Sequence, residues 1–182
     1  LKTHELCRVT LGFKNLKGLF HANTKKNAHN SKRTVDEYLS YLANQFYPNL
    51  TIIDGIYMLE NGPMHTGVAH RSNLIVAGRD MFSVDVVGSV LMGVPPSTVI
   101  HLDLFAKEHN RSLDIRDIEV KGLNVRDHIH PLGIGTPWVD NNRIPEVFVK
   151  QNLQGFDLPL PKVLCTGCSF VFPNVLMFLL SA

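Results

Sequence analysis

Cysteine is scarce in this 182-residue chain, which contains only three. A small, odd number of cysteines excludes the dense disulfide framework of secreted mini-domains and indicates a reducing compartment, so we expect a cytoplasmic protein. Two of the three form the motif Cys165-Thr-Gly-Cys168. Its two-residue gap lets both sulfurs reach one metal ion, as in half of a four-thiolate zinc or iron–sulfur site. A reduced, purely structural pair is the alternative.

A large charge excess and a long apolar run are also missing. The formal net charge of +2 does not indicate a nucleic-acid partner, and the basic stretch 25–33 has no aromatic residue to stack on a base. The apolar residues 170–182 are interrupted by Pro173 and Asn174 and are fewer than the roughly 20 needed to span a bilayer, so we expect a buried helix and no membrane partner. Because the chain begins with Leu1 and shows no leader pattern, we expect a piece of a longer protein.

Hydrophobic residues make up 45% of the chain, and their spacing predicts alternating strands and helices. The expected strands cover residues 7–13, 50–53, 74–77, 118–120 and 146–150, and the expected helices cover residues 35–46, 81–92 and 97–109. This order predicts an α/β fold with a layered, largely parallel or mixed sheet flanked by helices. We assign residues 1–160 to one domain, and we interpret 161–182, a strand, Cys-x-x-Cys and helix segment, as the start of a second lobe.

Polar loops follow several of the expected strands. Ligands of open α/β sheets tend to bind where strands end. We therefore expect residues 14–29 and the loop 60–67 to approach each other at one edge of the sheet and to form the principal polar cleft. The predicted ligand-binding residues are Lys14, Asn15, Gly62, His65 and Asp80, and Asp80 is also placed to cap the helix 81–92.

Titratable side chains mark two further candidates for chemistry. Asp85 lies on the apolar stripe of the helix 81–92, where burial of a carboxylate costs several kcal/mol unless it has a partner. It is either a structural acceptor for the amides of a neighbouring loop or a site carboxylate. The opening of the chain concentrates nitrogen groups that can bind a metal or act as a nucleophile. These residues are Lys2, His4, Lys14, Lys17, His21 and His29.

Several segments together resemble the DUF362 family, a domain of unknown function. The resemblance covers roughly residues 1–125 and rests on the order and spacing of its blocks, which are 2–4, 9–18, His29, 53–55, 62–63, Gly67, 77–80, Asp85 and 91–93. Many members of that family look iron–sulfur-associated. The resemblance therefore implies a ligand- or metal-binding module of a redox-linked protein, with a redox partner and an iron–sulfur cluster or a bound metal. His29, Cys165 and Cys168 would be the metal ligands.

A more distant likeness to the nickel-pincer lactate racemase family gives an alternative function. That family places a His, a cofactor-bearing Lys and a metal-binding His in the order of His4, Lys14 and His29, which implies a racemase or epimerase of a 2-hydroxy acid. Along an extended chain, His4 and Lys14 would lie about 20 to 35 Å apart, at about 3.3 Å per residue. They can meet only if the chain turns between them, and Cys7-Arg8 carries no strong turn signal. A scaffold without chemistry is the third interpretation.

Overall fold

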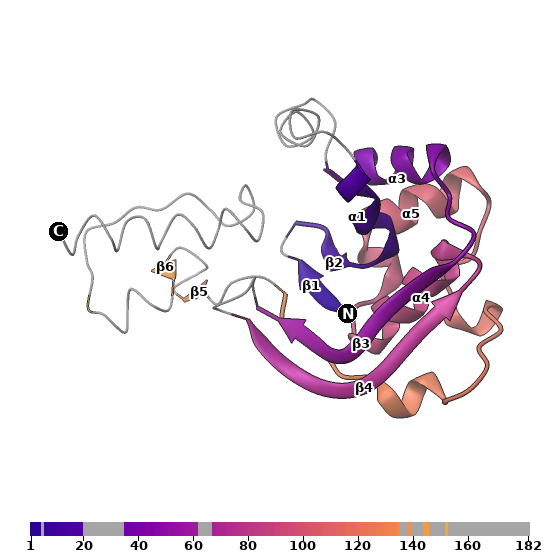
Figure 1. The fold of residues 1–182 in the computed structure, drawn as a ribbon. Coiled ribbons are helices and arrows are strands. Elements are labelled where there is room, and N and C mark those ends of the chain that lie inside the picture. The colour runs from indigo at the N-terminus through magenta and orange to yellow at the C-terminus, as the bar shows by residue number, and fades with distance from the viewer. Residues whose placement is uncertain are drawn as a thin grey trace.

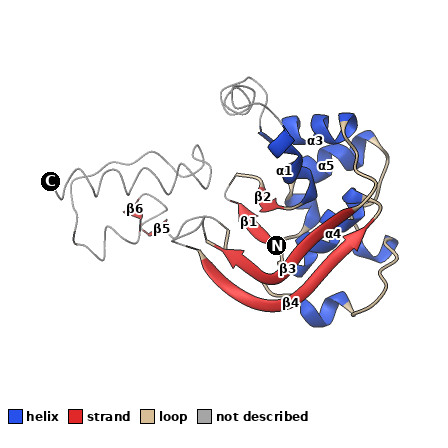
Figure 2. Cartoon of the chain, viewed as in Figure 1, coloured by secondary structure: helices blue, strands red, loops and turns tan. Residues whose placement is uncertain are grey.

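The computed structural model describes residues 1–4, 6–19, 35–61, 67–134, 138–139, 144–145 and 152. A four-stranded sheet with the order β2-β1-β3-β4 forms the main body, and the helices lie on the concave side of its curved β3–β4 pair (Figures 1 and 2). The predicted α/β class is confirmed. Of the two predicted kinds of sheet, the mixed one is correct.

Antiparallel pairing dominates the sheet. Its strands are β1 (Lys2–His4), β2 (Arg8–Thr10), β3 (Thr51–Glu60) and β4 (Val68–Gly78), and two short strands, β5 (Trp138–Val139) and β6 (Ile144–Pro145), pair separately. β1 is antiparallel to β2, and β3 is antiparallel to β4. Only β1 and β3 run parallel, with Lys2 opposite Leu59. A parallel pair needs a long crossover, and the short connection between β3 and β4 excludes one there.

The helices follow the predicted pattern with two differences. They are α1 (Gly12–Leu16), α3 (Val35–Gln45), α4 (Met81–Leu91) and α5 (Ile100–Glu108), and the 3-10 turns are η1 (Lys17–Leu19), η2 (Pro96–Thr98), η3 (Ile115–Asp117) and η4 (Val125–His128). The predictions for 35–46 and 81–92 are confirmed. The predicted helix 97–109 divides into η2 and α5, and α1 was not predicted.

Several predicted strand boundaries are wrong. The strand expected over 7–13 ends at Thr10, and its second half belongs to helix α1. The strands expected over 50–53 and 74–77 are parts of the much longer β3 and β4, because exposed isoleucines and polar residues continue the alternation. Residues 118–120 form no strand despite their alternating pattern. The strand expected over 146–150 lies outside the described residues.

The core lies between the sheet and α4. The side chains of Phe13, Met58 and Phe82 are completely buried there. The other face of the β3–β4 pair is not covered by the described residues, since Ile52 is 64% and Ile75 is 68% exposed. The described helices therefore bury one side of the sheet only.

Asp85 of α4 forms hydrogen bonds with the backbone at the start of α1. Its side chain is fully buried, and its two oxygens accept hydrogen bonds from the backbone N–H groups of Gly12 (2.8 Å) and Phe13 (2.9 Å). Helix α1 has no side-chain cap of its own, so this carboxylate replaces an N-cap. Burial raises the pKa of Asp85 to about 7, although both amides oppose that shift. The prediction that Asp85 is a buried hydrogen-bond acceptor is confirmed.

Asp80 caps α4, as predicted, and is the centre of a polar network. It accepts hydrogen bonds from the Ser83 backbone N–H (3.2 Å), from the Arg111 guanidinium (2.8 Å to Oδ1) and from the Tyr47 hydroxyl. The Tyr47 hydroxyl in turn accepts from the backbone N–H of Phe82 at 2.9 Å. Burial opposes ionisation of Asp80, but these donors together hold its pKa well below the usual range. Burial and the bond to Asp80 raise the pKa of Tyr47 to about 12.

Replacing Tyr47 by Phe should lower the free energy of unfolding by about 1–3 kcal/mol, because the Phe82 amide loses its acceptor and Asp80 loses a donor. Urea denaturation followed by circular dichroism measures this loss. The matched control is Tyr57→Phe, since Tyr57 is 55% exposed on the uncovered side of the sheet. Equal effects of the two substitutions would contradict the structural role of the Tyr47 hydroxyl.

Replacing Asp85 by Asn should also destabilise the fold by about 1–3 kcal/mol, since the amide of Asn can accept from only one of the two backbone N–H groups. The loss should depend on pH. Between pH 3.8 and about 7 the native Asp85 binds a proton that the unfolded chain lacks, so its contribution to stability falls as pH rises. Asn does not titrate, and the difference between wild type and Asp85→Asn should therefore shrink across this window.

Urea denaturation at several pH values between 4.5 and 7.5 tests this trend. The exposed Asp127, which lies far from α1, provides the control Asp127→Asn, whose effect should be small at every pH. A difference for Asp85→Asn that stays constant over this range would mean that Asp85 is ionised throughout.

Candidate functional site

The hairpin of β1 and β2 brings together residues that an extended chain would separate. β1 ends at His4, the chain reverses its direction before Arg8, and β2 returns so that Thr10 lies opposite Lys2. The Nδ1 atom of His4 accepts a hydrogen bond from the Cys7 backbone N–H at 3.2 Å. The His4 side chain thus stabilises the turn. The predicted extended path from His4 to Lys14 is wrong because of this turn.

One face of this hairpin is strongly polar. Cross-strand partners share a face, as do residues two positions apart, so Lys2, His4, Arg8 and Thr10 form one surface, which we call the hairpin face. The side-chain Nε of Arg8 and Oγ1 of Thr10 are buried and have no hydrogen-bond partner within the described part of the chain. Arg8 also has a left-handed backbone conformation, with φ of 62°. Left-handed backbone at a residue other than glycine is uncommon and often occurs at functional sites.

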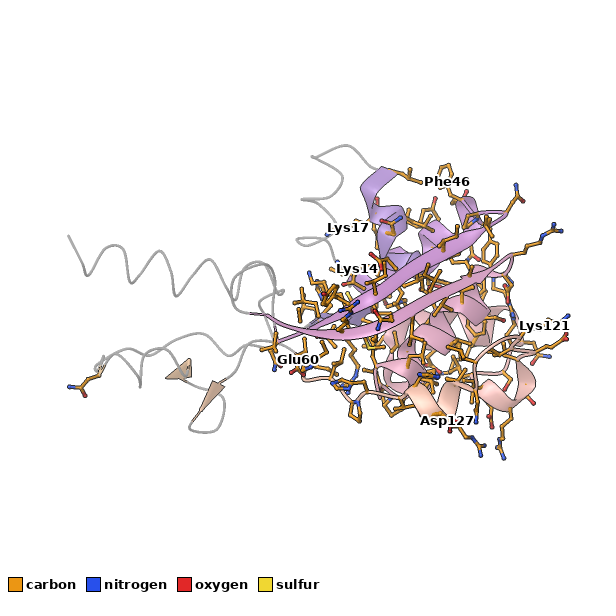
Figure 3. The ribbon with its side chains drawn as sticks, turned by 60° about the horizontal axis from the view of Figure 1, so that its bottom comes forward. Lys14, Lys17, Phe46, Glu60, Lys121 and Asp127 are labelled. Atoms are coloured by element: carbon orange, nitrogen blue, oxygen red, sulfur yellow. The ribbon has the colours of Figure 1, made fainter. Side chains whose placement is uncertain are left out.

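Lys14 lies close to the hairpin face. Burial lowers the pKa of Lys2, and the positive charge of Lys14 lowers it further. Within the described part of the chain, neither lysine forms an ion pair with a carboxylate. Figure 3 shows Lys14 and Lys17 on the same side of the molecule, with Glu60 at the tip of β3 and Lys121 far from all three.

A second polar group lies at the carboxyl ends of the parallel strands β1 and β3. We call it the Glu60 cluster, and it consists of Thr3, Glu60, His70, His130 and Gly133. The carboxylate of Glu60 contacts His70 Nε2 at 2.8 Å and accepts from the Gly133 backbone N–H, while Thr3 Oγ1 donates to the Gly133 carbonyl at 2.9 Å. The rings of His70 and His130 lie 4.6 Å apart. These contacts fasten residues 130–133 to the ends of both strands.

The Gly133 amide is the main reason that the pKa of Glu60 is lowered, and His70 contributes to the shift. The Glu60 carboxylate is therefore ionised and accepts a hydrogen bond from the imidazole of His70. Among the residues that the structure describes, no three His, Cys, Asp or Glu side chains are arranged to hold a metal ion. Cys7 is the one described thiol and is buried, so these residues do not fit an iron–sulfur cluster.

The described structure places some of the predicted site residues and not others. His4 ends β1, Lys14 and Asn15 lie in α1 rather than after a strand, and Asp80 and Asp85 are hydrogen-bonded as described above. Gly62, His65, His29, Cys165 and Cys168 lie outside the described residues, as does most of the predicted polar cleft. In the described part of the chain no helix is long and apolar enough to cross a membrane.

Sequence reasoning missed the role of Arg8 and Thr10. If the turn between β1 and β2 is not known, Arg8 and Thr10 read as alternating positions of one strand. No sequence pattern then pairs them with Lys2 and His4. It also missed a pocket of about 730 Å³ between the edge of β4, helix α4 and residues 117–123. Asp80 and Ser83 line this pocket. Asp80 was predicted to bind a ligand, but the pocket beside it was not predicted.

Comparison with known proteins gives the family. The family model described as a domain of unknown function, DUF362, matches residues 1–89, a shorter stretch than the resemblance noted above. A thylakoid-associated protein of Synechocystis sp. is 31% identical to this chain over 169 residues, which cover 90% of this chain and 48% of the relative. The chain thus spans about half of that relative's length. No solved structure matches. Residues 1–89, which contain the hairpin face, Lys14, Glu60, His70 and Asp85, therefore belong to the DUF362 family.

Proposed function

We propose that this chain is a ligand- or metal-binding module of a redox-linked protein, with its site at the carboxyl ends of β1 and β3. The observation that carries the proposal is the convergence of Thr3 and Glu60 on Gly133 at the ends of the two parallel strands, beside the imidazoles of His70 and His130. Ligand sites of α/β sheets lie at such strand ends. A carboxylate and several imidazoles can accept, donate or transfer protons there.

The redox link is supported by the family resemblance and by the Cys165 and Cys168 motif. Two thiolates separated by two residues suit half of an iron–sulfur or zinc site, and further ligands would have to come from other residues. When bound, an iron–sulfur cluster supplies one-electron transfer. The residues of the Glu60 cluster would then hold the ligand and its protons.

Analysis of the complete protein, purified anaerobically, tests the proposal. Metal analysis, visible absorbance and mass spectrometry of the small molecules released on denaturation should reveal a retained metal, cluster or ligand. Glu60→Ala and His70→Ala should reduce a ligand retained at the strand ends several-fold, and Cys165→Ser should bleach any cluster absorbance. The control is His109→Ala, because His109 is an exposed imidazole on another part of the fold. A wild-type protein that retains nothing would favour the scaffold interpretation.

The nickel-pincer-like racemase is a second candidate, and the turn between β1 and β2 favours it. The turn shortens the path between His4 and Lys14, which a straight strand would hold apart. The mechanism would also need His29 to approach both. Nickel content and racemisation of a 2-hydroxy acid should then both disappear in Lys14→Ala of the complete protein, whereas unchanged metal binding in that variant would contradict this alternative.

A further inference from the structure

The hairpin face contains more hydrogen-bond donors than the described protein groups use. Arg8 Nε and Thr10 Oγ1 are both buried, and neither has a hydrogen-bond partner among the described residues. Buried polar groups in native proteins nearly always have a partner, and exceptions often mark an ion or ligand that completes the site. Two such atoms on one face of a short hairpin therefore indicate that something binds there.

The charges around these two atoms define what can bind. Lys2 lies directly opposite Thr10, and Lys14 adds a second ammonium group in α1, the helix that directly follows β2. Guanidinium and ammonium groups can only donate hydrogen bonds, and a threonine hydroxyl can donate as well. Among the described residues no carboxylate forms an ion pair with Lys2, Arg8 or Lys14. A site of donors and positive charge without a counterion suits an oxyanion.

We propose that the hairpin face, together with Lys14, binds a small anion that carries a carboxylate or phosphate group. Arg8 and Lys14 supply the positive charge, and the Thr10 hydroxyl donates to one oxygen of the anion. The left-handed backbone of Arg8 belongs to the turn of the hairpin, in which the Val9 backbone N–H donates to the Cys7 carbonyl at 2.7 Å. This inference rests on the proposed ligand-binding function and gives the chemical class of the ligand.

Isothermal titration of the complete protein tests the site, with inorganic phosphate in one arm and succinate in the other, at about 0.15 M ionic strength to screen weak surface attraction. We expect saturable binding of at least one anion, and the arm that binds identifies the group. Arg8→Gln and Lys14→Met should each raise Kd by about tenfold or more, since each removes a charge-assisted hydrogen bond. The control Lys121→Met removes a fully exposed charge far from the hairpin and should leave Kd unchanged.

Thr10→Val separates binding from folding, because it keeps the shape of the side chain and removes only the unpartnered hydroxyl. Without anion, its melting temperature should equal or exceed that of the wild type, since a buried group without a partner is lost. The rise in melting temperature that the anion produces should become smaller. A lower melting temperature with an unchanged anion effect would show a structural role and overturn the assignment of Thr10.

Absence of saturable binding of either anion to the wild type would overturn the inference. So would an equal loss of affinity in Lys121→Met, which would show attraction to net charge only. Neither result depends on what the Glu60 cluster retains. A protein that binds no anion at the hairpin but releases a metal or small molecule that Glu60→Ala loses would refute this inference alone.

Discussion

The placement of the whole opening segment depends on the contact of the Asp85 carboxylate with the start of α1. Asp85 accepts hydrogen bonds from the first two backbone N–H groups of α1, a short helix that has no side-chain cap of its own. Gly12 is needed there, because a Cβ atom at this position would lie 2.8 Å from Asp85 Oδ1 and 2.9 Å from Met81 Cγ. The contact ends β2, begins α1 and thereby places Lys14 beside the hairpin.

The carboxylates and the cations of this domain differ in how many partners they have among the described residues. Asp80 and Glu60 each accept hydrogen bonds from several donors, and the buried Asp36 contacts His101 Nδ1 at 2.7 Å. These acidic groups join α3 to α5, α4 to the segment after α5, and the strand ends to residues 130–133. The cations Lys2, Arg8 and Lys14 have no such carboxylate among the described residues. The acidic side chains therefore hold the fold together, while no described carboxylate neutralises the positive charge of the hairpin.

The sequence predicts those parts of the fold that depend on local pattern. Helix α4 follows from its apolar residues, its cap Asp80 and Gly93, whose φ of 67° is the left-handed conformation that ends a helix. The buried acceptor role of Asp85 follows from a carboxylate on an apolar stripe. The turn between β1 and β2 could not be predicted from the sequence, because the His4 imidazole stabilises it and no Gly, Pro or Asn marks it. The hairpin face could not be predicted either, since its register depends on that turn.

The distance along the chain between Asp85 and the amides that it caps also affects the order of folding. The hydrogen bonds to Gly12 and Phe13 join residues that are 73 and 72 positions apart. Closing so long a loop is slow, and it requires α4 to be formed first. During synthesis the hydrogen bonds that cap α1 can form only after α4 has emerged.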